Sequence, residues 1–220
     1  MSITITIDWP AGSGKGTTAK QLAERLSYKY LDSGSMYRAL GIYLSENGAD
    51  IGHIMAELLE PIEISFNNEN HVCINGLDYE WKIRNSLASD LASQLSSQPV
   101  VRDFLIPQGQ RIIQDDNYIL EWRDTGTVWV PNAPIKIYLT ADPKARAHRR
   151  WMDLQKKWEM ISEDAVLEQI LERDSRDTTR ADGPLRKPEG AYEIDTTHMT
   201  IPEQINAIYK IVQEKSKIMK

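Results

Sequence analysis

The residues with the clearest chemistry stand near the start of the chain, in the run Pro10-Ala-Gly-Ser-Gly-Lys-Gly-Thr-Thr18. Before this run isoleucine alternates with threonine as in a short strand, and after it apolar residues recur at helical spacing. A glycine-rich turn between a strand and a helix presents backbone N–H groups to an anion, and the helix N-terminus adds partial positive charge. Lys15 can then reach the outer phosphates of a nucleotide, and Thr17 can approach a magnesium ion that bridges them.

The run departs twice from the general pattern G-x-x-x-x-G-K-[ST]. Trp9 stands where the first glycine belongs, and Gly16 separates Lys15 from Thr17. The alternative is an ordinary strand-to-helix turn that happens to contain glycine and lysine. The strand–loop–helix context favours a phosphate-binding loop. The residues expected to bind the nucleotide are Pro10, Ala11, Gly12, Ser13, Gly14, Lys15, Gly16, Thr17 and Thr18.

Two later segments carry arginines at helical spacing. Each set could form a solvated face, the first paired with Asp142 and Asp153, or it could bind anions. Phosphoryl transfer needs aligned phosphates and neutralised charge, and planar guanidinium groups suit phosphate oxygens. A phosphate loop for a donor together with arginines for an acceptor phosphate is the arrangement of a kinase. The two sets are Arg146, Arg149 and Arg150, and Arg173, Arg176 and Arg180.

Composition limits the classes of protein that could carry these residues. The chain has 220 residues, 41% of them hydrophobic and 26% charged, as in a globular protein. A net charge of -6 argues against a general nucleic-acid binder, which needs a basic surface. Cys73 is the only cysteine, so no internal disulfide can form, and a reducing compartment fits. No targeting or membrane-spanning pattern is evident, so we expect a cytoplasmic protein.

The elements that must position these residues alternate between strand and helix. This alternation predicts a parallel sheet covered on both faces, with ligands beyond the carboxyl ends of its strands. The phosphate loop, Glu121, Arg123 and Asp124 all follow such ends, so we expect them to converge. Strands are expected near 3–7, 28–31, 117–121, 134–139 and 192–195, and helices after Lys15 and near 36–44, 143–157, 162–176 and 202–219.

The stretch 61–86 has a different sequence pattern from the rest of the chain. Residues 62–66 and 71–74 alternate as strands and are separated by turn signals, which predicts a small antiparallel insertion. Residues 87–114 are expected to be helical, broken at Pro99 and disturbed at Pro107.

Five motifs, in this order along nearly the whole chain, resemble the bacterial-type cytidylate kinases. The resemblance implies an α/β fold, a P-loop NTPase three-layer sandwich with a central parallel sheet, a small antiparallel insertion and a helical lid. It implies a single domain over 1–220, with 61–86 as an acceptor-side subdomain and 148–165 as the lid. The reaction implied is transfer of the γ-phosphate of ATP to CMP or dCMP with Mg²⁺. From the net charge and the lack of a membrane-spanning pattern we expect neither a nucleic-acid nor a membrane partner, and we expect a monomer. The motifs are Gly12-Ser-Gly-Lys-Gly-Thr17, Leu31-Asp-Ser-Gly-Ser-Met-Tyr-Arg38, Arg123-Asp-Thr-Gly-Thr-Val128, Pro131-Asn-Ala-Pro134 and Glu172-Arg-Asp-Ser-Arg-Asp177.

The resemblance also implies roles for single residues. Lys15, Arg123, Arg149 and Arg150 match catalytic positions, and Thr17 a magnesium position. The positions that hold or surround the CMP phosphate are Ser33, Arg38, Arg123 and Arg180. Those that read the cytosine edge are Ser93, Arg102 and Asp124, and a carboxylate can accept from the cytosine 4-amino group. Those near the sugar are Arg173 and Asp177.

Four tryptophans stand where the family carries or often carries glycine: Trp9, Trp122, Trp81 and Trp158. At Trp9 a side chain would crowd the phosphate loop, and a glycine-type backbone angle costs another residue roughly 1–2 kcal/mol. One hypothesis is a relative with weakened catalysis that still binds nucleotide. Another is a conceptual translation in which UGA codons for glycine were read as tryptophan. A third alternative is a monophosphate kinase for UMP or AMP.

Overall fold

The computed structural model describes residues 2–11, 15–156 and 158–218, with only the backbone of Lys15 and Ile218. The chain divides into two compact units. We call residues 1–30 and 116–220 the sheet unit, and residues 31–115 the helical unit.

The larger sheet has five strands in the order β2-β6-β1-β7-β8. Strands β1 with β6, β1 with β7, and β7 with β8 pair in parallel. Asp8 at the end of β1 is level with Trp122 on one side and Tyr138 on the other, so the carboxyl ends of three strands meet at one edge. This confirms the predicted parallel sheet. The strands are β1 (Thr4–Asp8), β2 (Lys29–Asp32), β6 (Tyr118–Trp122), β7 (Ile135–Thr140) and β8 (Tyr192–Asp195).

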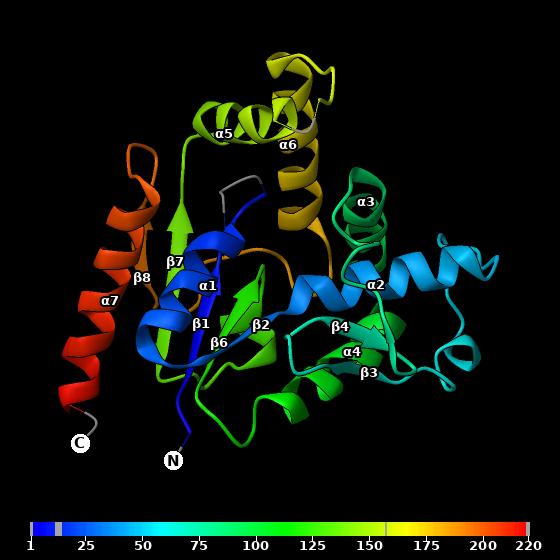
Figure 1. Ribbon diagram of the computed structural model, residues 1–220, viewed down its shortest axis with the longest axis horizontal. Helices are drawn as coiled ribbons and strands as arrows, with labels where there is room; N and C mark the ends of the chain where they lie inside the picture. Colours follow the sequence, from blue (N-terminus) through cyan, green and yellow to red (C-terminus); the bar gives the residue numbers. More distant parts are fainter. Residues whose placement is uncertain (1, 12–14, 157, 219–220) are drawn as a thin grey trace. The chain divides into compact units, whose positions relative to one another are not determined.

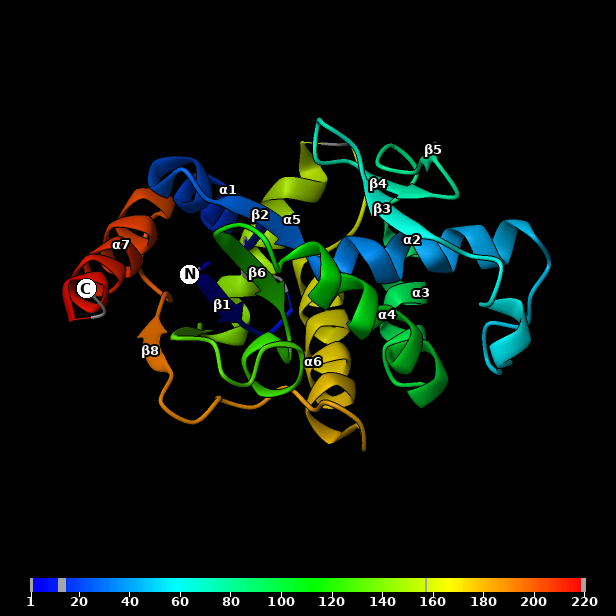
Figure 2. The same cartoon turned by 90° about the horizontal axis from the view of Figure 1, so that it is seen from below.

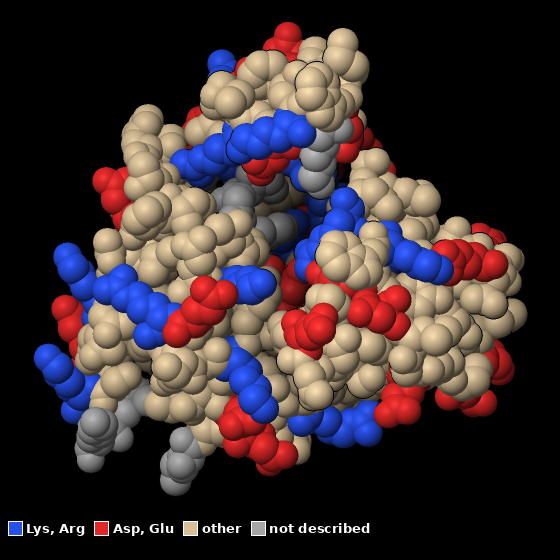
Figure 3. Space-filling model, viewed as in Figure 1, with Lys and Arg blue, Asp and Glu red and all other residues tan. Residues whose placement is uncertain are grey.

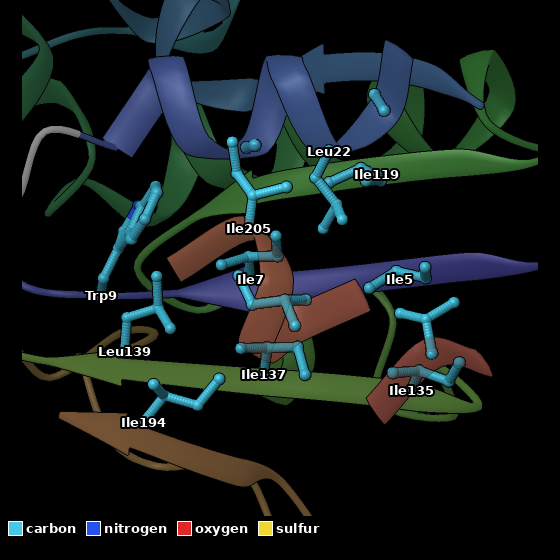
Figure 4. Close-up of a cluster of buried hydrophobic side chains, with 14 residues drawn as sticks. Ile5, Ile7, Trp9, Leu22, Ile119, Ile135, Ile137, Leu139, Ile194 and Ile205 are labelled. Atoms are coloured by element: carbon cyan, nitrogen blue, oxygen red, sulfur yellow. The ribbon is translucent and has the colours of Figure 1, made fainter. Parts of the chain in front are cut away.

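Two helices cover one face of this sheet. Helices α1 (Lys15–Leu26) and α7 (Ile201–Ile218) lie side by side over β1 and β7 (Figure 1, Figure 2). Alternate strand residues such as Ile5, Ile7 and Ile137 pack against apolar residues of both helices (Figure 4). The opposite face of β1 is also buried, including Thr6 and Asp8, and β1 there meets the π-helical turn η2 (Thr125–Trp129).

A helical hairpin follows β7 within the sheet unit. Helices α5 (Pro143–Gln155) and α6 (Glu163–Thr179) pack on one another beyond the carboxyl end of β7 (Figure 1). Asp142 caps α5 by accepting from Lys144 N and Ala145 N, and Ser162 caps α6 by accepting from Ala165 N. The predicted lid segment 148–165 comprises the end of α5, the turn and the start of α6.

The helical unit holds the second sheet. Strands β3 (Ile64–Phe66), β4 (Val72–Ile74) and β5 (Leu77–Asp78) pair antiparallel in sequence order, all within the predicted insertion. The two-residue strand β5 was not predicted, because so short a strand has no alternation to detect. The unit's helical elements are α2 (Ser33–Glu46), the 3₁₀ turn η1 (Ala56–Leu58), α3 (Ser86–Leu95) and α4 (Pro99–Ile112).

Two details of the helical unit show how local sequence sets its helices. Asp32 caps α2 by accepting from Ser35 N, and α2 begins at Ser33, three residues before the expected start. The helical stretch is broken before Pro99, as predicted, and helix α4 then runs through Pro107 without ending. A proline removes only one backbone donor, and the buried Leu105 and Gln108 on either side keep the helix packed.

Among the described residues, no helix combines the length and apolar character needed to cross a bilayer. Acidic and basic side chains are interspersed over the face shown in Figure 3.

Candidate active site

The phosphate-loop segment runs from the end of β1 to the first turn of α1. Gly12, Ser13 and Gly14 lie outside the described residues, as does the side chain of Lys15. Thr17 is exposed in the first turn of α1. Thr18 is buried, and its hydroxyl donates to Gln204 Oε1 of α7 over 2.9 Å. Thr18 therefore anchors α1 to α7 through its side chain, which leaves Thr17 as the accessible hydroxyl.

Trp9 directly follows β1 and is fully buried. Its backbone N–H donates to Trp122 O, and its indole Nε1–H donates to Glu121 Oε2 over 2.9 Å. Tyr30 Oη donates to the other oxygen of the same carboxylate, also over 2.9 Å. Figure 4 shows the Trp9 ring in the cluster between the sheet and α1. The indole thus has a packed position and a hydrogen-bond acceptor within the core.

The backbone at Trp9 corrects one expectation. Among the described non-glycine residues, positive φ occurs at Ser27, Asn70, Asn75 and Trp158, and not at Trp9. The glycine-type angle expected at position 9 is therefore wrong for this chain, and no backbone strain arises there.

Arg123 follows β6 and is fully buried. Its Nε donates to Asp177 Oδ2 over 2.7 Å, and its guanidinium carbon lies 4.7 Å from the centre of the Trp122 ring. Neither terminal nitrogen, Nη1 or Nη2, has a hydrogen-bond acceptor among the residues that the structure describes. Buried donors without acceptors are costly, roughly 1–3 kcal/mol each and more when charged. These two nitrogens can donate to an anionic ligand.

The acidic residues around Arg123 belong to the same electrostatic network. Burial alone would raise the pKa of Asp177, but the charges of Arg123, Arg173 and Arg180 hold it below the ordinary value. Arg173 Nε lies 4.0 Å from Asp177 Oδ2, and Arg180 Nη2 lies 3.4 Å from Asp124 Oδ2. The structure thus brings together the five site residues predicted in the sheet unit, and Asp177 is ionised at neutral pH.

Asp8 links the end of β1 to the chain after Asp124. Its Oδ1 accepts from Thr125 N and Oγ1, each over 2.6 Å, and its Oδ2 accepts from Gly126 N over 2.8 Å. Burial raises the pKa of the Asp8 carboxyl to about 6, and the hydrogen bonds from Thr125 and Gly126 oppose that rise. A Cβ at Gly126 would approach Asp8 Oδ2 to 3.0 Å and Thr6 Oγ1 to 2.9 Å, so the turn requires glycine.

The helical unit contains the other predicted acceptor residues. Arg38 is buried on α2 and forms an ion pair of 2.5 Å with Asp32, and Ser33 is buried in the first turn of the same helix. Ser93 on α3 and Arg102 on α4 are also buried, and Arg102 Nη1 donates to Ser96 O over 3.4 Å. The nine predicted acceptor residues are therefore divided between the units. Ser33, Arg38, Ser93 and Arg102 are in the helical unit, and Arg123, Asp124, Arg173, Asp177 and Arg180 are in the sheet unit.

The two predicted lid arginines lie on α5. Arg149 Nη2 donates to three carbonyl oxygens after β8, those of Thr196, Thr197 and Met199, over 2.6, 3.0 and 3.3 Å. Desolvation lowers the pKa of Arg149, against the opposing charge of Asp195. Arg150 is partly buried.

The third arginine of that helix was not predicted as a site residue. Arg146 is buried and forms an ion pair of 2.6 Å with Asp174 of α6, so the proposed partners Asp142 and Asp153 are wrong for it. Helical spacing showed that Arg146 shares a face with its neighbours, but spacing carries no signal for burial against a distant helix.

Comparison of the sequence with known proteins identifies the family of this chain. The model of the family described as "Cytidylate kinase" matches residues 5–214. The chain belongs to this family. It is 42% identical to the cytidylate kinase of Thermosipho africanus, covering 99% of this chain and 98% of that protein. It is 39% identical to the cytidylate kinase of Thermotoga maritima, covering 98% and 99%.

Structural comparison supports the fold. A gluconokinase from Sinorhizobium meliloti superposes with a TM-score of 0.52, covering 99% of this chain and 95% of that one. Its sequence identity is 10%, so the likeness concerns the fold alone. The predicted fold class, a parallel sheet with flanking helices and a small antiparallel insertion, is confirmed.

Proposed function

We propose that this member of the cytidylate kinase family transfers the γ-phosphate of ATP to CMP or dCMP, giving ADP with CDP or dCDP. The observation that carries the proposal is the buried Arg123, whose Nη1 and Nη2 have no acceptor in the described part of the chain. A nucleotide phosphate supplies the missing acceptors, and a guanidinium binds two phosphate oxygens in a planar fork. Catalysis then requires positioning and charge neutralisation more than covalent chemistry.

The donor is proposed to bind at the loop after β1, with Lys15 at its outer phosphates. Thr17 fits a magnesium ligand better than Thr18, because its side chain is exposed while the Thr18 hydroxyl is bonded to Gln204. When bound, Mg²⁺ would neutralise charge on the phosphates. The segment 148–165 is proposed to close over ATP, with Arg149 or Arg150 at its phosphates.

The acceptor is proposed to bind through the nine residues predicted for it. Arg123, with Ser33, Arg38 and Arg180, binds its phosphate. Asp124, Ser93 and Arg102 read the cytosine edge, with Asp124 accepting from the 4-amino group. Arg173 and Asp177 bind the sugar. The lowered pKa of Asp177 supports this role, because an ionised carboxylate accepts from sugar hydroxyls while it also holds Arg123 Nε.

An ADP-release assay with CMP, dCMP, UMP and AMP tests the function and its base specificity. We expect kcat/KM for CMP or dCMP to exceed that for UMP by at least about tenfold, since a site built for the cytosine 4-amino donor rejects a base that has a carbonyl there. We expect it to exceed that for AMP as well, because a purine is larger than the pyrimidine that the site is proposed to bind. Asp124→Asn is expected to lower kcat/KM for CMP by about tenfold or more. A preference for UMP or AMP would overturn the cytosine assignment.

A weakened, nucleotide-binding relative is the second candidate, because Trp9 and Trp122 replace family glycines. The Trp9 ring is accommodated in the core, which supports an active chain. The assay is repeated on Trp9→Gly with Trp122→Gly. CMP binding without ADP formation, restored by this double variant, would establish the weakened relative. The intact mass of protein from the native source tests whether the tryptophans are incorporated. We further propose a cytoplasmic monomer, which sedimentation equilibrium and fractionation test.

A further inference from the structure

Ala11 is the last described residue before the glycines of the phosphate loop, and side chains from two helices bind its backbone. Asp174 Oδ1 of α6 accepts from Ala11 N–H over 3.0 Å. Arg146 Nη1 of α5 donates to Ala11 O over 2.6 Å. Ala11 is 2% exposed and Arg146 3%. Both peptide groups flanking this alanine are therefore fixed by charged partners.

The two side chains also hold each other. Arg146 Nη2 lies 2.6 Å from Asp174 Oδ2, and Arg146 Nε donates to Ala141 O, just after β7, over 3.0 Å. Each of the three guanidinium nitrogens thus has its own oxygen partner. Lysine carries the same charge but cannot occupy these three positions with a planar fork. We call Arg146, Asp174 and Ala11 the clasp.

The helical hairpin does not need the clasp to pack. Helices α5 and α6 share an apolar cluster of their own, formed by Ala147, Leu154, Val166 and Ile170. A buried ion pair adds little net stability, because desolvation offsets much of its attraction. Its directed hydrogen bonds, by contrast, fix the orientation of the one residue from which the chain enters the phosphate loop.

We propose that Arg146 and Asp174 are positioning residues for ATP, which hold Ala11 so that the following loop and Lys15 meet the donor phosphates. The inference rests on the proposed function. It assigns to Asp174 a role separate from that of Asp177, which lies one turn later on α6 and holds Arg123 at the acceptor phosphate. The pair acts through Ala11.

The test measures donor and acceptor affinity separately. Asp174→Asn keeps an oxygen for Ala11 N–H but removes the ion pair, and Arg146→Lys keeps the charge but removes the fork. We expect the calorimetric Kd for ATP to rise about tenfold or more in both, with KM for CMP within about twofold. Matched controls remove one exposed charge from each helix, at Asp153 and Glu172, which pair with Lys156 and Arg176. Asp153→Asn and Glu172→Gln are expected to leave both affinities unchanged.

Hydrogen exchange of the peptide containing Ala11 gives a readout that needs no nucleotide. Asp174→Ala is expected to speed exchange of the Ala11 amide, while the two controls leave it protected. Three results would each contradict the proposed role of the clasp. They are an unchanged ATP affinity in both clasp variants, equal losses of affinity for ATP and CMP, and an unchanged exchange rate of the Ala11 amide in Asp174→Ala. A wild-type chain without kinase activity would overturn the proposed function instead, and the exchange experiment would still decide the clasp.

Discussion

Single residues at the ends of β1 and β6 connect the sheet to the proposed chemistry. Asp8 binds the turn after Asp124, Glu121 binds Trp9 and Tyr30, and Arg123 binds Asp177. Each pairing joins residues far apart in sequence. These carboxylates and guanidiniums therefore fix the strand ends to one another before any ligand binds.

Asp8 gives a pH-dependent prediction at this scale. Its pKa is about 6 in the folded chain and 3.8 as the ordinary value, so the folded state binds its proton more tightly. Its contribution to stability is therefore fully present below pH 3.8 and is lost as the pH rises through 6. The loss is on the order of 3 kcal/mol.

Thermal and urea unfolding of the wild type and Asp8→Asn from pH 4 to 7 measures this loss. In Asp8→Asn the side-chain amide nitrogen faces a backbone N–H of Thr125 or Gly126 at every pH, and both groups are donors. The variant is therefore less stable than the wild type over the whole pH range. Its deficit relative to the wild type should shrink as the pH rises. A deficit that stays constant from pH 4 to 7 would show that Asp8 does not titrate there.

The sequence predicted residues better than it predicted their partners. Arg123, Asp124 and Asp177 were chosen by family resemblance, and the structure brings them together. The hydrogen bond between Asp174 and Ala11 was missed, because a contact with a backbone 163 residues away leaves no pattern along the chain. Whether a charged side chain is exposed to solvent or buried depends on tertiary packing, which sequence spacing alone does not reveal.

At the scale of elements, the end of α5 shows why glycine suits position 158. Trp158 N–H donates to Gln155 O, and Glu159 N–H donates to Leu154 O, the pairing of a Schellman motif. The residue at this position takes a left-handed conformation, and Trp158 has φ of 60° with its side chain 91% exposed. The ring thus gains little burial to offset the strain.

We therefore predict that Trp158→Gly stabilises the protein. The left-handed backbone costs a non-glycine residue roughly 1–2 kcal/mol, so a net gain of about 1 kcal/mol is expected. A midpoint rise of about 2–4 °C in calorimetry would follow. Trp81→Gly is the matched control: Trp81 is 83% exposed, but it is not among the described residues with positive φ. Stabilisation of similar size at both positions would refute the backbone explanation.

Element boundaries followed from sequence to within a few residues, because caps and periodicity are local. The predicted start of α5 at Pro143 was correct. The exception was β5, and at Pro107 tertiary packing lets α4 continue through the proline. Local propensity indicates where an element can end, and packing decides whether it does.

At the scale of the whole molecule, the proposed binding of CMP affects the stability of the folded chain. A ligand that binds only the folded protein stabilises it by mass action, about 2.7 kcal/mol at one hundred times its Kd. We predict that CMP at this excess raises the unfolding midpoint by roughly 5–11 °C for a chain of this size. The rise should be much smaller in Arg123→Gln, whose guanidinium is replaced.

Differential scanning fluorimetry with CMP and, as control, cytidine without a phosphate measures this shift. Equal shifts for both compounds would mean that the phosphate contributes nothing, which would contradict the role of Arg123.

The single turn of α6 from Asp174 to Asp177 limits how this enzyme can be redesigned. Asp174 at one end of that turn binds Ala11 of the proposed donor loop, and Asp177 at the other end binds Arg123 of the proposed acceptor site. A substitution that tilts α6 to admit a new base would also move Asp174 away from Ala11, and on the proposed role of the clasp it would weaken ATP binding. Changes of base preference are therefore better sought at Ser93 and Arg102, on α3 and α4, where a side chain can be exchanged while that turn stays intact.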